Sequence, residues 1–123
     1  HCNAPDVFIA ENCKNLEYIS PDCVFGSCID ISGTNIREWH CNAPDVFIAE
    51  NCKNLEYVSP ECIFGDGVSI EGTSIKEWHC DVPDDFYARD SKLEKISNCE
   101  IKGEILVNDN VKIITEETPR MRM

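Results

Sequence analysis

The sequence has no long hydrophobic run and few basic residues. Its longest apolar stretches cover three or four residues, whereas a membrane-spanning helix needs roughly 20, so we expect no membrane insertion. Lysine and arginine total 11 against 23 aspartate and glutamate residues, which gives a formal net charge of −12. Such a surface repels phosphate groups. It therefore argues against nucleic acid as a partner and favours a protein with a basic face.

The short motifs of common enzyme classes are also missing. The sequence contains no glycine-rich phosphate loop, no nucleophile elbow and no H-E-x-x-H zinc motif, and each of these carries a specific chemistry. We therefore predict that the protein is not an enzyme, with no catalytic residue, no cofactor and no metal.

Internal repetition dominates the chain. Residues 1–39 recur as residues 40–78 with 29 of 39 positions identical, and an eroded third copy spans residues 79–97. Each unit divides into two halves with one apolar rhythm, so the period is a coil of 19 or 20 residues. The inward positions of this rhythm are predicted to be Val7, Ile9, Leu16 and Ile19 in the first half and Ile29, Ile31, Ile36 and Trp39 in the second.

The differences between the two copies indicate which side chains point inward. Asp30 becomes Ser69, whereas its neighbour Ile29 becomes Val68 and so loses one methyl group. Variable and conservative positions alternate, as on a strand with one buried face. Prolines and glycines in every coil disfavour helices, so we predict short parallel strands stacked coil on coil. The turn out of each strand is expected to carry a ladder of polar side chains, namely Asn12, Thr34, Asn51 and Thr73.

The segments I-D-I-S-G-T-N-I-R-E-W (29–39) and V-S-I-E-G-T-S-I-K-E-W (68–78) resemble leucine-rich repeats, L-x-L-x-x-(N/T)-x-L-x-x-L. The short period is similar to that of the bacterial-type repeats, although isoleucine, valine, tryptophan and cysteine replace most leucines. The predicted fold is a mainly β, leucine-rich-repeat-like solenoid of about six coils with a parallel sheet of short strands. A parallel β-helix with similar coils is the alternative.

The repeat coils are expected to occupy residues 1–97, and residues 98–123 to hold the last coil, a C-terminal cap and a polar tail. Residues 104–115 are interpreted as a final strand, an Asn-Asp-Asn turn and a closing strand. No comparable cap precedes His1. We therefore expect further coils, a partner or a second copy of the chain to cover that edge.

Three His-Cys pairs, at residues 1–2, 40–41 and 79–80, suggest a zinc site or a thiol–imidazole pair. Strand neighbours point to opposite faces, and copies two coils apart are separated by roughly 9.6 Å, whereas zinc needs ligands within about 2.3 Å. We therefore interpret these cysteines as small buried residues and the histidines as outward side chains. Among the nine cysteines we favour thiols, although Cys23 could approach Cys2 or Cys41 in an adjacent coil.

The strand alternation also predicts a binding face, with phenylalanines standing outward about 9.6 Å apart. Leucine-rich repeats bind proteins through their strand face, and the resemblance implies the same here. The predicted partner-binding residues are Phe8, Asp30, Ser32, Phe47, Ser69, Glu71 and Phe86. Two alternatives are that a loop covers the rings or that the alternation is shifted by one residue.

Two functions follow from this interpretation. The first is a recognition module that binds another protein through the strand face. The second is a structural solenoid that stacks end to end through its uncapped N-terminal edge or attaches to a larger surface or coat protein. The sequence does not determine the cellular compartment.

Overall fold

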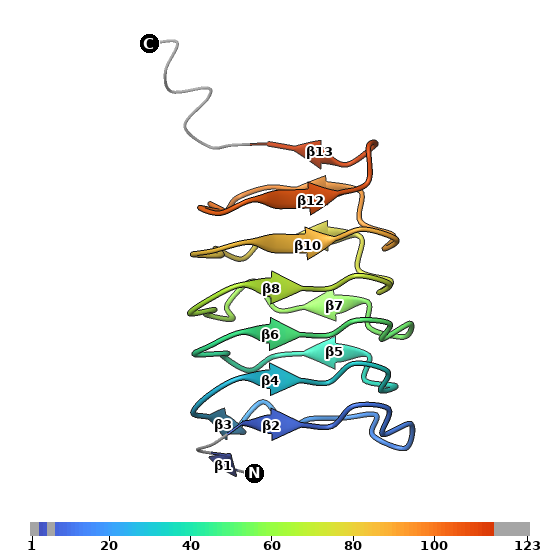
Figure 1. The fold of residues 1–123 in the computed structure, drawn as a ribbon, viewed down its shortest axis with the longest axis vertical. Coiled ribbons are helices and arrows are strands. Elements are labelled where there is room, and N and C mark those ends of the chain that lie inside the picture. Colours follow the sequence, from blue (N-terminus) through green and yellow to red (C-terminus); the bar gives the residue numbers. More distant parts are fainter. Residues whose placement is uncertain (1–2, 5–6, 115–123) are drawn as a thin grey trace.

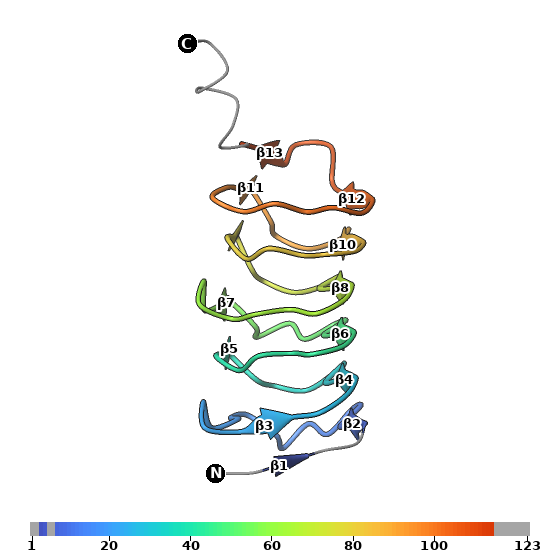
Figure 2. The same cartoon turned by 90° about the vertical axis from the view of Figure 1, so that its left-hand side faces the viewer.

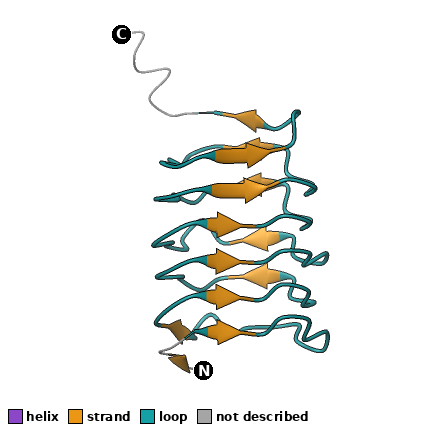
Figure 3. Cartoon of the chain, viewed as in Figure 1, coloured by secondary structure: helices purple, strands orange, loops and turns teal. Residues whose placement is uncertain are grey.

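The computed structural model describes residues 3–4 and 7–114. They wind into a β-solenoid of about six coils, and the described chain contains strands, turns and loops but no helix (Figures 1 and 3). The predicted mainly β solenoid is therefore confirmed. Without a helix, the described part of the chain offers no helical segment able to span a bilayer.

One parallel sheet, here called the main sheet, takes a strand from every coil (Figure 1). Its strands are, in order, β2 (Phe8–Ile9), β4 (Ile29–Asp30), β6 (Phe47–Ile48), β8 (Val68–Ser69), β10 (Phe86–Ala88) and β12 (Ile105–Val107). Successive partners are separated by 21 and 18 residues alternately up to β10. Each coil thus adds one rung, about 4.8 Å above the last.

Shorter strands follow two further sides of the coil (Figure 2). On the second side, β5 (Glu38–Trp39) pairs with β7 (Tyr57–Val58), and β11 (Lys95–Ile96) lies between β9 (Glu77–Trp78) and β13 (Lys112–Ile113). On the third side, β1 (Asn3–Ala4) pairs with β3 (Val24–Phe25), and single bridges join Ala43 to Phe64 and Val82 to Ile101. A coil with strands on three sides is typical of a parallel β-helix, which is the alternative fold that the sequence predicts.

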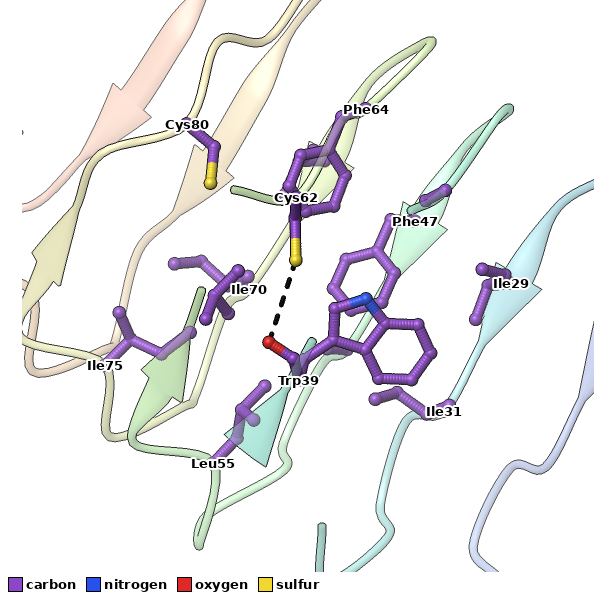
Figure 4. Close-up of a cluster of buried hydrophobic side chains, with 14 of the residues drawn as sticks. Ile29, Ile31, Trp39, Phe47, Leu55, Cys62, Phe64, Ile70, Ile75 and Cys80 are labelled. Atoms are coloured by element: carbon purple, nitrogen blue, oxygen red, sulfur yellow. Dashed lines mark hydrogen bonds between the residues drawn. The ribbon is translucent and has the colours of Figure 1, made fainter. Parts of the chain in front are cut away.

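Aliphatic and aromatic side chains from all three sides fill the interior (Figure 4). Ile29, Ile31, Ile36 and Trp39 are fully buried, which confirms the inward positions predicted for the second half of each unit. Ring centroids 4.9 to 5.6 Å apart form one continuous stack. From coil to coil it contains Phe8, Phe25, Trp39, Phe47, Phe64, Trp78 and Phe86.

The predicted alternation is wrong by one residue in the first half of each unit. Val7 and Ile9 are 52% and 64% exposed, while Phe8 between them packs against the core. In the second copy, Phe47 and Ala49 are both fully buried. A large phenylalanine followed by a small alanine therefore takes the two inward positions that Ile29 and Ile31 take in the preceding coil.

The turn after each main-sheet strand explains this phase. Asn12 and Asn51 adopt φ angles of 59° and 61°, and Gly33 and Gly72 adopt 75° and 76° at the equivalent place in the neighbouring coils. Because Asn and Gly tolerate this left-handed conformation, Asn12 aligns with Gly33. The predicted ladder of four polar side chains is therefore split into two rows. Asn12 and Asn51 alternate with glycines in the first row. Thr34 and Thr73 belong to the second row, one residue further along the chain, and both are buried.

The predicted strands near the C-terminus are present as β12 and β13. They join the main sheet and the second side as parallel strands. The expected polar tail lies outside the described residues, as do His1 and Cys2 of the expected N-terminal edge.

Candidate interaction face

The main sheet has more strands than any other sheet of the described residues, so its outer face is their longest regular array of side chains. Because strand side chains alternate, each inward residue is flanked by two outward ones. One outward column contains Val7, Cys28, Val46, Gly67, Asp85 and Glu104. The next contains Ile9, Asp30, Ile48, Ser69, Tyr87 and Leu106. We call these two columns, together with the acidic residues beside them, the outer face.

The phenylalanine side chains do not lie on this face but point into the core. Phe47 and Phe86 have no exposed surface, and Phe8 is half-buried in the ring stack. Their predicted partner-binding role as exposed rings is therefore wrong. The alternative of an alternation shifted by one residue is the arrangement observed.

The four polar residues predicted for the face do lie on or beside it. Asp30 and Ser69 occupy one outward column, and Ser32 and Glu71 follow two residues later, where both are half-buried. Ser69 is 7% exposed because its hydroxyl donates a 2.9 Å hydrogen bond to Oε2 of Glu50. The Ser32 hydroxyl accepts a bond from the Glu50 backbone N–H.

The aliphatic residues of the face were not predicted. Val7 and Ile9 are exposed, and Val46, Ile48 and Leu106 are half-buried. The two copies are identical over V-F-I-A, so their comparison gives no information there. Aligning Asn12 with Gly33 as two left-handed turn residues would have placed the aliphatic side chains outward.

The main sheet carries a hollow of about 280 Å³ between β6 and β10. Gly67 has no side chain and Ser69 has a short one, so β8 forms a depression between the larger side chains on each side of it. We call this the acidic hollow. Gly67, Val68 and Ser69 line the hollow from the central coil, and Val46, Ile48 and Tyr87 line it from the coils on each side. The acidic residues that line it are Glu50, Asp66, Asp84 and Asp85.

Carboxylates crowd the rim of the acidic hollow. A hydrogen bond with Asp66 raises the pKa of Asp84, and neighbouring Asp85 raises it further. The Tyr87 hydroxyl donates a 3.0 Å bond to Asp85 Oδ2. In the described chain the ion pairs join His40 to Glu38 and His79 to Glu77, so no lysine or arginine there forms an ion pair with this rim.

A second carboxylate pair lies at the other end of the outer face. This pair consists of Glu11 and Asp30, and the hydrogen bond between them raises the pKa of Glu11. Burial disfavours ionised Asp30, but hydrogen bonds from Glu11 and Ser32 outweigh burial and lower the Asp30 pKa. Acidic groups thus follow the face over several coils.

The two described His-Cys pairs take the positions expected for structural residues. Cys41 and Cys80 are 2% exposed, and the half-buried rings of His40 and His79 bond to glutamates at 2.9 and 3.0 Å. Cys23 is disulfide-bonded. Its predicted neighbour Cys41 keeps a thiol that donates to Ser20 O at 3.2 Å. The other predicted neighbour, Cys2, lies outside the described residues.

Metal ligands do not gather in residues 3–4 and 7–114, where no three His, Cys, Asp or Glu side chains could hold an ion together. No protein-family model, characterised protein or solved structure matches the chain. The resemblance to leucine-rich repeats therefore stands on the repeat residues alone.

Proposed function

We propose that the protein is a recognition module whose outer face binds an extended, basic segment of another protein. The observation that carries this proposal is the acidic hollow, in which apolar groups lie beside carboxylates that form no ion pair with a described lysine or arginine. A site with these two properties fits a segment that offers both aliphatic surface and positive charge.

The apolar part of the face supports a protein partner. Val7 and Ile9 are more than half exposed. Past Cys28 and Asp30 of the intervening coil, Val46, Ile48 and Tyr87 line the acidic hollow. Exposed apolar surface rimmed by polar residues is typical of interaction sites. An aromatic residue among aliphatic ones is also typical of interface centres.

The charge of the face supports a basic partner. Asp66, Asp84, Asp85 and Glu50 surround the apolar groups of the hollow, and carboxylates attract lysine and arginine both at long range and in contact. Lysine and arginine also have long aliphatic stems that pack on apolar surface while the charged end stays at the rim. The resemblance to leucine-rich repeats favours the same strand face.

The proposal is tested with synthetic peptides that alternate lysine with leucine, and with matched peptides that carry glutamate in place of lysine. Fluorescence anisotropy with the described protein should detect binding of the lysine peptide only. Binding should weaken between about 0.02 and 0.3 M salt, because the Debye length shortens from roughly 20 Å to below 8 Å. It should also weaken as the pH falls. Asp84 loses its charge at a higher pH than an ordinary aspartate does.

Matched variants locate the binding site. The double variant Asp66→Asn, Asp84→Asn should weaken binding about 2- to 30-fold, which corresponds to rim ion pairs of about 0.2 to 1 kcal/mol each. The double variant Glu61→Gln, Glu100→Gln removes the same charge at exposed positions near the third side and should leave binding nearly unchanged. Equal losses in both variants would show general charge attraction and contradict the proposal.

End-to-end assembly is the second candidate function. It is favoured by the main sheet's end strands, β2 and β12, each of which has one strand neighbour among the described residues. Light scattering over a concentration series separates the two functions. Particles that grow without limit would support assembly, and a stable monomer that binds the lysine peptide would support recognition.

A further inference from the structure

A row of cysteines follows the third side of the solenoid, one in each successive coil. The row contains Cys23, Cys41, Cys62, Cys80 and Cys99. In the sequence these cysteines occupy only two positions of the repeated 39-residue unit. Because each unit winds into two coils, the two positions fall on the same side of the solenoid, and the cysteines form one row from coil to coil.

Two pairs of these cysteines lie in register across a backbone-paired step, Cys80 with Cys99 beside the Val82–Ile101 bridge and Cys41 with Cys62. The second pair is buried on both sides. Ala43 and Phe64 form a parallel bridge, and Cys41 and Cys62 each lie two residues before it. The Ala43 N–H donates to Ile63 O at 2.9 Å, and the Gly65 N–H donates to Ala43 O at 2.8 Å. Paired parallel strands are about 4.8 Å apart, which lies within the Cα separation of about 4.4–6.8 Å that a disulfide needs.

Both cysteines belong to the buried core, and each thiol bonds to a carbonyl oxygen of the preceding coil, Ser20 O for Cys41. Cys41 and Cys62 are 2% and 6% exposed. The Cys62 thiol donates to Trp39 O at 3.7 Å, so its sulfur extends toward the coil that carries Cys41 (Figure 4). Burial, and next the neighbouring Cys41, raise the pKa of Cys62 to about 12. The row also accommodates a disulfide one coil earlier, at Cys23.

We propose that Cys41 and Cys62 are a modification site, and that they form a disulfide between adjacent coils when the protein meets a disulfide oxidant such as oxidised glutathione. The Cys41 thiolate attacks the oxidant, which forms a mixed disulfide and releases one glutathione thiol. The Cys62 thiolate then attacks the Cys41 sulfur and releases the second glutathione. Two protein thiols are oxidised to one disulfide, and one glutathione disulfide is reduced to two thiols.

Both cysteines line surface hollows. Cys41 and Cys23 contribute to a hollow of about 490 Å³ beside Val24 and His40. Cys62 contributes to a second hollow of about 290 Å³. The raised pKa values keep the thiolate fraction small at neutral pH, so the exchange should be slow and should accelerate with rising pH.

The backbone pairing selects Cys41 over Cys80 as the partner of Cys62. The bridge between Ala43 and Phe64 holds the Cys41 and Cys62 coils together at this side. No bridge in the described chain joins Phe64 to the Val82 coil there.

The disulfide would connect the coils that supply the floor of the acidic hollow. Cys41 shortly precedes β6, and Cys62 shortly precedes β8. Closing a loop of this length restricts the unfolded chain. Oxidation should therefore raise the urea midpoint of unfolding and hold β6 and β8 in register.

Peptide mapping without reduction tests the proposal. The protein is treated with oxidised glutathione at mildly alkaline pH, once in the folded state and once during refolding from urea. We expect a Cys41–Cys62 linked peptide and a higher urea midpoint that dithiothreitol reverses. Cys41→Ala and Cys62→Ala should each abolish the link and the increase.

Cys52→Ala is the matched control. Cys52 is equally buried, but its thiol donates to Ile31 O and faces Thr34 rather than another cysteine. This variant should keep the link. Failure to link Cys41 to Cys62 in both the folded and refolding experiments, or a link from Cys62 to Cys80, would overturn the proposal. Neither result bears on peptide binding by the outer face.

Discussion

At the scale of single residues, the left-handed turn after each main-sheet strand sets the phase of the coil. Asn12, Gly33, Asn51 and Gly72 all have positive φ. A side-chain carbon on Gly72 would lie 2.6 Å from Oδ1 of Asn51, and one on Gly33 would lie 2.4 Å from Oδ1 of Asn12. Asparagine and glycine therefore complement each other between coils, because the asparagine side chain occupies the space that glycine leaves.

Gly72→Ala should lower the free energy of unfolding by about 1–3 kcal/mol, the usual cost of a left-handed non-glycine residue. The clash with Asn51 adds to this cost. Gly67→Ala is the matched control in the same coil, because its added carbon would lie 3.3 Å from Asp85 O, with no positive φ. Urea unfolding of both variants measures the difference. Equal destabilisation would contradict the role given to the turn.

At the scale of one element, β6 separates the core from the outer face. Phe47 is fully buried between the rings of Trp39 and Phe64, and its neighbour Ile48 lines the acidic hollow. The two residues are adjacent in sequence, yet one contributes to stability and the other to the proposed binding surface. Phe47 supports the stack of coils, and Ile48 supplies apolar surface to the proposed site.

Phe47→Ala should therefore lower the free energy of unfolding by about 3–5 kcal/mol, as for other buried aromatic truncations. Ile48→Ala should cost less than about 1 kcal/mol, because the half-buried side chain loses little buried area. It should nevertheless weaken binding of the lysine peptide. Urea unfolding and anisotropy on the same samples provide both values. A larger loss of stability for Ile48→Ala than for Phe47→Ala would reverse the assignment.

The elements also show how far the sequence could predict the structure. Comparison of the two copies places Ile29 and Asp30 on the correct faces, because their counterparts, Val68 and Ser69, differ in the way that buried and exposed positions do. The segment V-F-I-A is unchanged between copies, and both of its alternations present apolar residues to the interior. Hydrophobicity alone therefore could not choose between them, and the turn geometry at Asn51 decides it.

At the scale of the whole molecule, the three sides of the coil differ in continuity. The main sheet pairs without interruption from β2 to β12, whereas the third side pairs coils two by two in the described chain. The repeat predicted the stacking and the number of coils. It could not predict the acidic hollow, because Gly67, Ile48 and Asp84 come together only through the register of three coils.

The central claim is that phenylalanine lies inside and the neighbouring aliphatic residues lie outside on the main sheet. Methyl NMR of isoleucine-labelled protein with a soluble paramagnetic agent tests it most directly. We expect strong broadening of the Ile9 and Ile48 methyl signals, while Ile29 and Ile70, which have no exposed surface, keep theirs. Ile9 and Ile48 signals as protected as that of Ile29 would contradict the account.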